Sequence, residues 1–161
     1  MPFTHRSRAH RLLLLSTLVW ASACVEPADR RPGTWLSGEI ATEAVGDWSF
    51  TDAHREILIE TRTLYWIPHS VTIVCAATDG KLYVGARNPD GKRWVANVDR
   101  DPEVRLKIGD RVYELRLVPV ESADVREAVF SAYSAKYGWS ASAPEERPPF
   151  RSWEVVEREA G

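Results

Sequence analysis

The segment "HSVTIVCAATDGKLYVGARNPDGKRWVANVDRDPEVRL", residues 69–106, carries the strongest structural signal in the chain. Asp79-Gly80 separates an apolar run over residues 69–77 from an alternating stretch. This dipeptide favours a type I′ hairpin turn, because such a turn needs positive φ at both central residues. The apolar run is typical of a strand buried on both faces. We therefore expect an antiparallel hairpin, then a loop, then a short helix near Trp94.

Further strands are expected on both sides of this segment. "EVRLKI", residues 103–108, alternates apolar and charged side chains, and Gly109-Asp110 provides a tight turn into "RVYELRLVPV", residues 111–120. "EILIETRT", residues 56–63, and "RSWEVVE", residues 151–157, complete the set. Alternation of this kind places one face of a strand on a core and the other in water.

Two helical segments are predicted besides the one near Trp94. Residues 122–137 form the long helix, with Ser122 as N-cap and Gly138 at its end. "SFTDAHRE", residues 49–56, predicts one short turn with Thr51 as N-cap. About six strands with one long helix and short helices predict a mainly β protein, a small closed β-barrel.

The N-terminus has the layout of an export signal. Residues 1–11 carry three arginines and no acid, and the apolar run "LLLLSTLVWASA" follows at residues 12–23. "ASAC" resembles the bacterial lipobox, so we expect a signal peptide over residues 1–23 and lipidation at Cys24. Plain secretion and a retained anchor remain alternatives. Residues 24–45 are interpreted as a flexible tether, and residues 46–161 as the barrel domain.

Charge and cysteine content exclude some functions. Without residues 1–23 the chain keeps 18 basic and 23 acidic residues, so no electrostatic case exists for binding nucleic acid. The chain is long enough to bury a core without a disulfide, and Cys75 is expected to be a buried strand residue. No HExxH motif, CxxC motif or histidine cluster occurs, so no metal site is predicted.

The order of these pieces resembles the flavin-binding split β-barrel superfamily, which includes pyridoxamine phosphate oxidase and the deazaflavin-dependent nitroreductases. "PHSV" at residues 68–71, "DGKLYV" at residues 79–84 and "WVANVDRDPEVRL" at residues 94–106 carry the resemblance. The last is similar to the pattern W-x-x-N-L-x-x-x-P-x-V of the deazaflavin branch, with Val98 in place of Leu. The resemblance runs from about Trp48 to about Gly138.

The resemblance implies a homodimer that holds FMN or a deazaflavin in the groove between its subunits. The implied cofactor-binding residues are His69, Ser70, Thr72, Arg87, Lys92, Arg93, Trp94 and Asn97. A cofactor phosphate needs convergent donors, which an Arg side chain and a helix N-terminus provide. Trp94 stands where the phosphate-oxidase branch usually has a Lys.

Each of these residues also has a purely structural interpretation. His69 would be a strand-start residue satisfied by backbone groups. Arg87, Lys92 and Arg93 would be the solvated flank of a hairpin. Trp94 would fill the core at a helix start, and Asn97 would cap the short helix or tie it to the next strand.

No nucleophile–base pair or carboxylate dyad stands out, so any chemistry would belong to a bound cofactor, which points to hydride transfer. The leading prediction is a membrane-tethered, flavin- or deazaflavin-binding barrel in the bacterial cell envelope, acting as an oxidoreductase on a small molecule. One alternative is a non-enzymatic module for a small or haem-like ligand. Another is a structural envelope lipoprotein.

Overall fold

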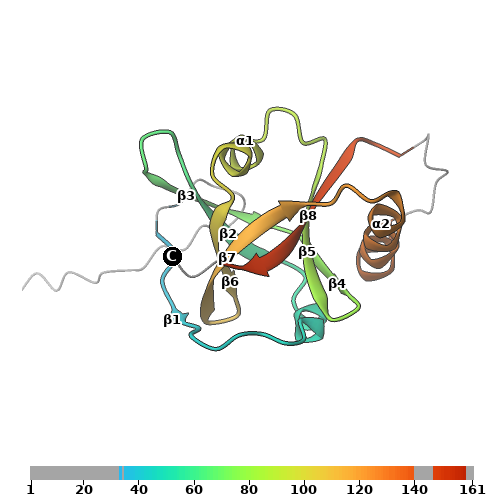
Figure 1. The fold of residues 1–161 in the computed structure, drawn as a ribbon, viewed down its shortest axis with the longest axis horizontal. Coiled ribbons are helices and arrows are strands. Elements are labelled where there is room, and N and C mark those ends of the chain that lie inside the picture. The colour runs from blue at the N-terminus through green and yellow to red at the C-terminus, as the bar shows by residue number, and fades with distance from the viewer. Residues whose placement is uncertain (1–32, 34, 140–146, 159–161) are drawn as a thin grey trace, which may run out of the picture.

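The computed structural model describes residues 33, 35–139 and 147–158 (Figure 1). The elements in chain order are β1 (Glu39–Ile40), the 3₁₀ helix η1 (Ser49–Ala53), β2 (Ile57–Arg62), β3 (Pro68–Ile73), β4 (Cys75–Thr78), β5 (Lys81–Arg87), α1 (Arg93–Arg100), β6 (Glu103–Ile108), β7 (Arg111–Pro119), α2 (Ala123–Tyr137) and β8 (Phe150–Glu157).

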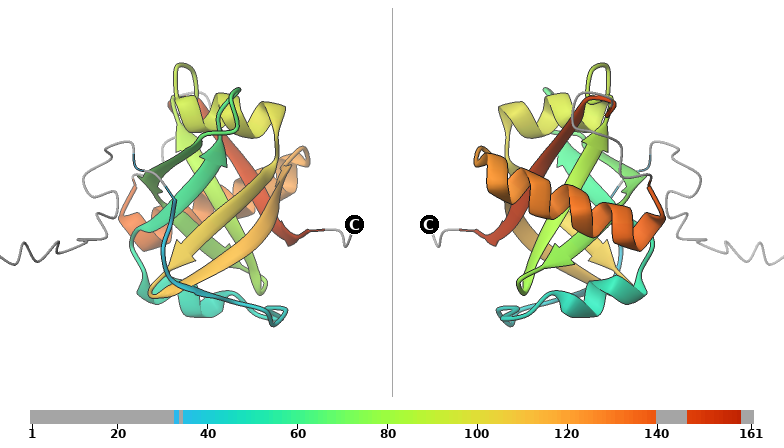
Figure 2. Two further views of the ribbon diagram at one scale, coloured as in Figure 1. Left: turned by 90° about the vertical axis from the view of Figure 1, so that its left-hand side faces the viewer. Right: turned by 90° about the vertical axis from the view of Figure 1, so that its right-hand side faces the viewer.

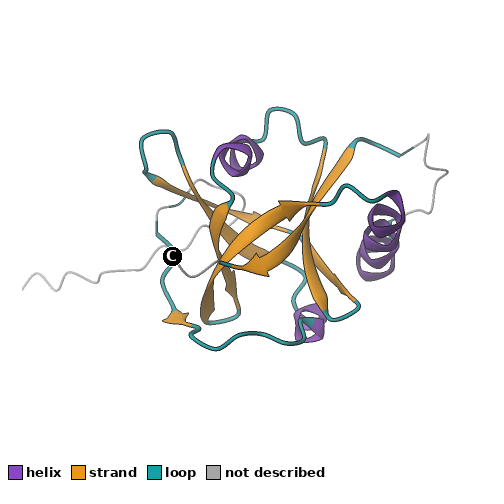
Figure 3. Cartoon of the chain, in the orientation of Figure 1, coloured by secondary structure: helices purple, strands orange, loops and turns teal. Residues whose placement is uncertain are grey.

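The strands form one 8-stranded sheet in the order β3-β2-β6-β7-β8-β5-β4, with β1 added to β7 (Figure 3). Neighbours along this path are antiparallel, and β1 is parallel to β7. The two ends of the path, β3 and β4, are separated in sequence only by Val74. One bent strand therefore closes the sheet into a barrel, because it pairs with β2 before the bend and with β5 after it.

The barrel interior is the main hydrophobic core. Inward residues of β2, β5, β6 and β7 are almost fully buried, among them Ile59, Val84, Leu106 and Leu117. Helix α1 covers one end of the barrel and η1 lies at the opposite end (Figure 2). Trp94 and its helix neighbours join this core, so α1 forms a lid on the barrel through its apolar face.

Helix α2 lies outside the barrel, across β4 and β5 (Figure 2). Val129 and Tyr133 are fully buried there, with Tyr83 of β5 and Ala76 of β4. A cluster of stacked and edge-on rings extends from this layer to Trp139 and Phe150. Aromatic burial of this size fastens the helix to the sheet.

Several sequence predictions are confirmed. The chain is a mainly β barrel with helices, and α2 has the predicted bounds, with Ser122 accepting the Val125 N–H and Gly138 in the left-handed region at φ 69°. Asp79 and Gly80 both have positive φ, 52° and 73°, as a type I′ turn requires. Gly109-Asp110 links β6 to β7.

Other predictions are wrong in detail. Residues 69–77 are not one strand buried on both faces, because the chain bends at Val74, and Val71, Thr72 and Val74 are only partly buried. This bend and the two-residue β1 raise the strand number above six. Thr51 is not an N-cap, because it lies inside η1, where its hydroxyl donates to the Trp48 carbonyl oxygen at 2.7 Å.

The described part of the segment interpreted as a tether packs on the barrel. Leu36 is 3% exposed and its N–H donates to Glu60 Oε2 at 2.6 Å, while Glu39–Ile40 pairs with β7. The folded unit therefore begins before residue 46. The predicted signal peptide, Cys24 and the start of the tether lie outside the described residues. Among the helices of the described ranges, none is long and apolar enough to cross a membrane.

Candidate functional site

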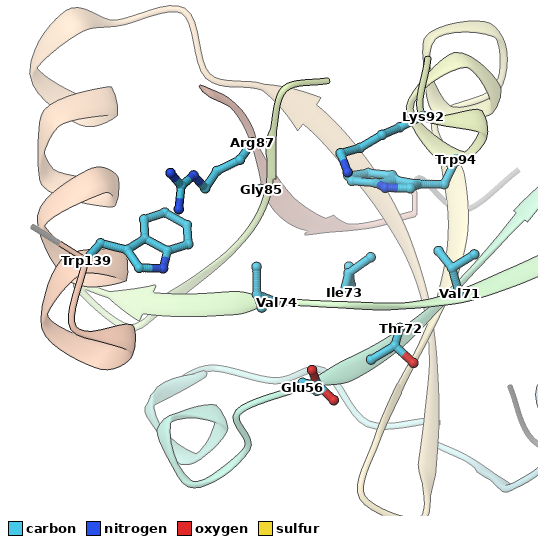
Figure 4. A pocket seen from close by; sticks show the side chains of 10 residues that line it. All are labelled: Glu56, Val71, Thr72, Ile73, Val74, Gly85, Arg87, Lys92, Trp94 and Trp139. Carbon is cyan, nitrogen blue, oxygen red and sulfur yellow. The ribbon is translucent and has the colours of Figure 1, made fainter. Parts of the chain in front are cut away.

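The bend at Val74 opens a cleft in the barrel wall. Strand β4 pairs with β5 only from Lys81 to Val84, and β3 turns away to pair with β2, so no described strand pairs with Gly85–Arg87 on this side. A cleft of about 470 Å³ lies at this split, within the range of roughly 300–1,000 Å³ usual for small-molecule sites. Its lining residues are Glu56, Val71, Thr72, Ile73, Val74, Gly85, Arg87, Lys92, Trp94 and Trp139 (Figure 4).

One wall of the cleft is the edge of β3. Val71 and Ile73 point toward Lys92 and Trp94, whereas Thr72 points the other way, toward Glu56 (Figure 4). Alternate residues of a strand face opposite sides, so the cleft reaches around the edge of the strand. The side facing α1 is apolar, and the side facing Glu56 is polar.

Two cations stand over the apolar wall. Arg87 is the last residue of β5 and lies beside Trp139, whereas Lys92 is the N-cap residue of α1 and lies beside Trp94 (Figure 4). Arg87 lies over the Trp139 ring, with Cζ 5.1 Å from the ring centroid. This stacking orients the guanidinium while its N–H groups remain available for an anion.

Trp94 has two roles in the structure. Its ring is only 6% exposed and packs against Trp153, with ring centroids 5.3 Å apart. The ring therefore fills the core, as one of the two interpretations predicted. The same ring also borders the cleft beside Lys92 (Figure 4). It supplies a rigid apolar surface there.

Gly85 is required by the packing behind the cleft. A Cβ at this position would lie 2.5 Å from Phe150 Cζ and 3.1 Å from the Tyr133 hydroxyl. The absence of a side chain lets Phe150 cross β5 and complete the aromatic layer under α2.

Two tyrosines of α2 hold the bend in place. The Tyr133 hydroxyl shares its proton between the carbonyl oxygens of Val74 and Tyr83, at 3.0 and 3.1 Å. The Tyr137 hydroxyl accepts the Cys75 N–H at 3.2 Å and lies 2.7 Å from the Cys75 carbonyl oxygen. At the bend, α2 therefore supplies hydrogen bonds to backbone groups that a neighbouring strand would otherwise bond. This keeps β3 and β5 apart.

The predicted site residues divide into two groups. Thr72, Arg87, Lys92 and Trp94 line the cleft. The other four do not line it. His69 and Ser70 are buried in β3, Arg93 borders a separate surface hollow beside Asp99, and Asn97 lies on the buried face of α1.

Asn97 has the structural role that was the alternative to cofactor binding. Its Nδ2 donates to Thr61 Oγ1 at 3.0 Å, and its Oδ1 accepts from Arg100 at 3.0 Å. The Thr61 hydroxyl in turn donates to the His69 carbonyl oxygen at 3.3 Å. This chain of bonds ties α1 to β2 and β3, and so fixes the helix beside the cleft.

His69 is a buried base. It is 9% exposed, and its Nδ1 has no hydrogen-bond partner among the described residues. Burial lowers the pKa of His69, and the nearby positive charge of Arg93 lowers it further. The imidazole is therefore held neutral in the folded protein at pH 7, and it does not reach the cleft.

Sequence reasoning missed Trp139, Glu56 and the Val71–Ile73 pair. Trp139 directly follows the helix-ending Gly138, a place where an apolar residue often packs back on the helix, and it stacks on Tyr133 at 5.2 Å. That signal predicts packing, not a cleft. Glu56 precedes β2 and has no sequence signal for a site.

The cleft is suited to non-covalent binding. Glu56 is its only carboxylate among the described lining residues, and no described group of His, Cys, Asp and Glu would hold a metal ion. Burial raises the pKa of the Cys75 thiol, so this residue is not an activated nucleophile. Cations above an apolar and aromatic wall match a flat molecule that carries an anionic group.

Comparison with known proteins finds similarity of fold alone. No family model and no curated protein matches the sequence. A F420-H2-dependent reductase (FDR-A) superposes with a TM-score of 0.51 at 20% identity, over 65% of this chain and 95% of that chain. A putative pyridoxamine 5'-phosphate oxidase from Listeria innocua gives 0.51 at 15%, over 67% and 87%. The haem storage protein HutZ from Vibrio cholerae gives 0.55 at 12%, over 69% and 87%.

These comparisons confirm the split β-barrel fold. The names of the three solved proteins refer to different molecules, F420-H2, pyridoxamine 5'-phosphate and haem, and their identities to this chain are all low. One fold serves several functions, so the ligand must be argued from the cleft itself.

Proposed function

We propose that the cleft binds a flavin or deazaflavin cofactor and that the protein is an oxidoreductase acting on a small molecule. The observation that carries this proposal is that two cations, Arg87 and Lys92, line an apolar, aromatic-walled cleft at the barrel split. The sequence resemblance and the fold support it. When bound, such a cofactor supplies hydride transfer.

The residues present fit the two parts of such a cofactor. Arg87 and Lys92 would hold the phosphate, because Arg offers a planar fork and Lys a point charge. Val71, Ile73 and Trp94 would lie against the ring system and exclude water from it. Glu56, on the polar side of the strand edge, would face a polar substituent.

We also propose a homodimer, as the resemblance implies, and export to the bacterial cell envelope with a lipid anchor on Cys24. Sedimentation velocity of purified protein tests the dimer. A Cys24→Ser variant tests the anchor: it should lose acyl labelling and leave the membrane fraction. Acyl labelling that persists in the variant would contradict lipidation at this residue.

The cofactor proposal is tested by titration. A chain of residues 25–161 keeps every described element, so its absorbance and fluorescence are recorded with FMN, a deazaflavin and haemin in turn. We expect a flavin-type cofactor to bind well below about millimolar, which corresponds to roughly −4 kcal/mol.

The Arg87→Ala variant should weaken binding by about 1.5–3 kcal/mol, the contribution of a charge-assisted hydrogen bond. That is roughly 10- to 150-fold in Kd. Arg111→Ala is the matched control, since Arg111 is half-exposed on β7 and pairs with Glu39 outside the cleft. If haemin alone binds, the non-enzymatic ligand-binding function replaces this one; if nothing binds, the structural one does.

A further inference from the structure

We propose that the turn between β2 and β3 is a membrane-contacting element that inserts into the headgroup region of a lipid bilayer. The hairpin tip, residues 64–67, carries four consecutive large apolar side chains: Leu64 is 65% exposed, Tyr65 79%, Trp66 72% and Ile67 59%. The tip projects from the barrel near the end covered by α1 (Figures 1 and 2).

Such a cluster differs from ordinary surface exposure. Single exposed apolar residues are common on folded proteins, but a contiguous exposed apolar group marks a contact site. The composition here is that of a membrane interface: Tyr and Trp rings prefer the headgroup level, and Leu and Ile prefer the acyl chains below it.

The tip is held in one conformation by Thr63. The Trp66 N–H donates to the Thr63 carbonyl oxygen at 3.0 Å, and the Ile67 N–H donates to Thr63 Oγ1 at 3.2 Å. The Thr63 N–H donates to the Ile67 carbonyl oxygen at 3.0 Å. Trp66 is kept at φ 61°, a conformation that costs energy for a bulky residue. The exposed side chains are therefore presented by an ordered turn.

Positive charge lies directly behind the tip. The Arg62 guanidinium stands over the Trp66 ring, with Cζ 5.5 Å from the centroid. Arg100 donates to the Arg62 carbonyl oxygen at 2.9 Å, which brings a second guanidinium to the base of the hairpin. Asp101 offsets part of this charge, at 3.8 Å from Arg62. Arginines behind inserted aromatic rings match the phosphates of anionic lipids.

The position of the N-terminal segment favours a lipid surface over a protein partner. Gly33 pairs with Ser70, three residues after the tip, so the chain enters the described unit at the base of this hairpin. Cys24 lies nine residues earlier in sequence, at most about 30 Å away. This step rests on the proposed lipid anchor, whereas the exposed tip itself does not.

Insertion would also set the position of the cleft. Val71 of β3 is four residues past Ile67, which is roughly 13 Å at the usual rise per residue of a strand. The bound cofactor would then stand close to the membrane surface. A substrate of lipophilic character, drawn from the bilayer, fits this placement.

Vesicle co-sedimentation of residues 25–161 tests the proposal, because this chain lacks Cys24 and any acyl group. Vesicles of phosphatidylethanolamine and phosphatidylglycerol should bind it, and phosphatidylcholine vesicles should bind it more weakly. The Leu64→Ser/Trp66→Asn variant should lose at least about tenfold in partitioning. Asn accepts positive φ, so the turn is retained. The control Ile40→Ser/Val118→Ser removes apolar side chains that are also exposed, 43% and 41%, but lie elsewhere.

Insertion depth is read with a second variant. Trp66→Phe keeps an apolar side chain and removes the one tryptophan of the tip, so it should still bind, while the share of tryptophan emission that brominated lipids quench should fall. Equal vesicle binding by the wild type and Leu64→Ser/Trp66→Asn would overturn the proposal. A second result would also overturn it: the wild type fails to bind vesicles but forms a dimer in sedimentation velocity, and the variant abolishes that dimer. The tip would then be a contact between copies of the chain. Flavin titration of the same variants reports the cleft separately.

Discussion

Replacing Tyr133 by Phe should destabilise the protein by about 1–3 kcal/mol, because it leaves the Val74 carbonyl oxygen without its donor. Tyr133 is fully buried, so water has no access to replace the hydroxyl. Tyr137→Phe should cost less, roughly 0.5–1.5 kcal/mol, because Tyr137 is only partly buried.

These changes are measured by chemical and thermal unfolding. Each kcal/mol should lower Tm by roughly 3–6 °C for a domain of this size. Amide hydrogen exchange adds a local readout: the Cys75 N–H should exchange faster in Tyr137→Phe, because the tyrosine oxygen is its acceptor. Tyr65→Phe is the matched control, since Tyr65 is 79% exposed and the same change there should stay within about 0.5 kcal/mol.

High pH tests the same contacts. Burial raises the pKa of Tyr137 to about 12, and that of Tyr133 well above its usual value. The unfolded chain releases these protons near pH 10 while the folded protein retains them. Stability is therefore full below pH 10 and falls as pH rises toward 12, and Tyr137→Phe should flatten this fall. If both Phe variants kept the stability of the wild type and its rate of Cys75 N–H exchange, the role of α2 in holding the bend would be refuted.

Three further changes test other parts of the structure. Gly85→Ala should destabilise by about 1–3 kcal/mol in thermal unfolding, because its Cβ would meet Phe150 at 2.5 Å. Asn97→Ala should lower the free energy of unfolding by about 1–2 kcal/mol in chemical unfolding, since it removes the hydrogen bond that the buried Thr61 hydroxyl accepts. Acidification should lower Tm as pH falls below about 6.5. Because the pKa of His69 is lowered in the folded protein, the unfolded chain binds this proton first. His69→Gln should reduce the slope of Tm against pH.

Each of these changes has its own comparison. Gly46→Ala adds a Cβ with nothing within 4 Å and should be nearly neutral. Thr61→Val and Asn97→Ala form a double-mutant cycle, and a coupling of zero would contradict their contact. His54→Gln accompanies the pH series, and an equal change of slope in both variants would remove His69 as the cause.

Local sequence rules were sufficient for most elements. The Asp79-Gly80 turn, the Gly109-Asp110 turn and the caps of α2 were predictable because each depends on the φ preference or side-chain oxygen of one or two residues. The barrel class followed from the number and alternation of strands. The resemblance located Arg87, Lys92 and Trp94 near a cleft.

The sequence by itself therefore determined the strands, their turns and the fold class, because these follow from interactions within a few residues. Only the tertiary structure decided where the barrel splits. The apolar run at residues 69–77 gives no sign of the bend at Val74, which depends on hydroxyls that Tyr133 and Tyr137 bring from about 60 residues away in the chain. That distant pairing separates β3 from β5 and leaves the cleft that Arg87 and Val71 line, whereas His69 and Asn97 are buried outside it.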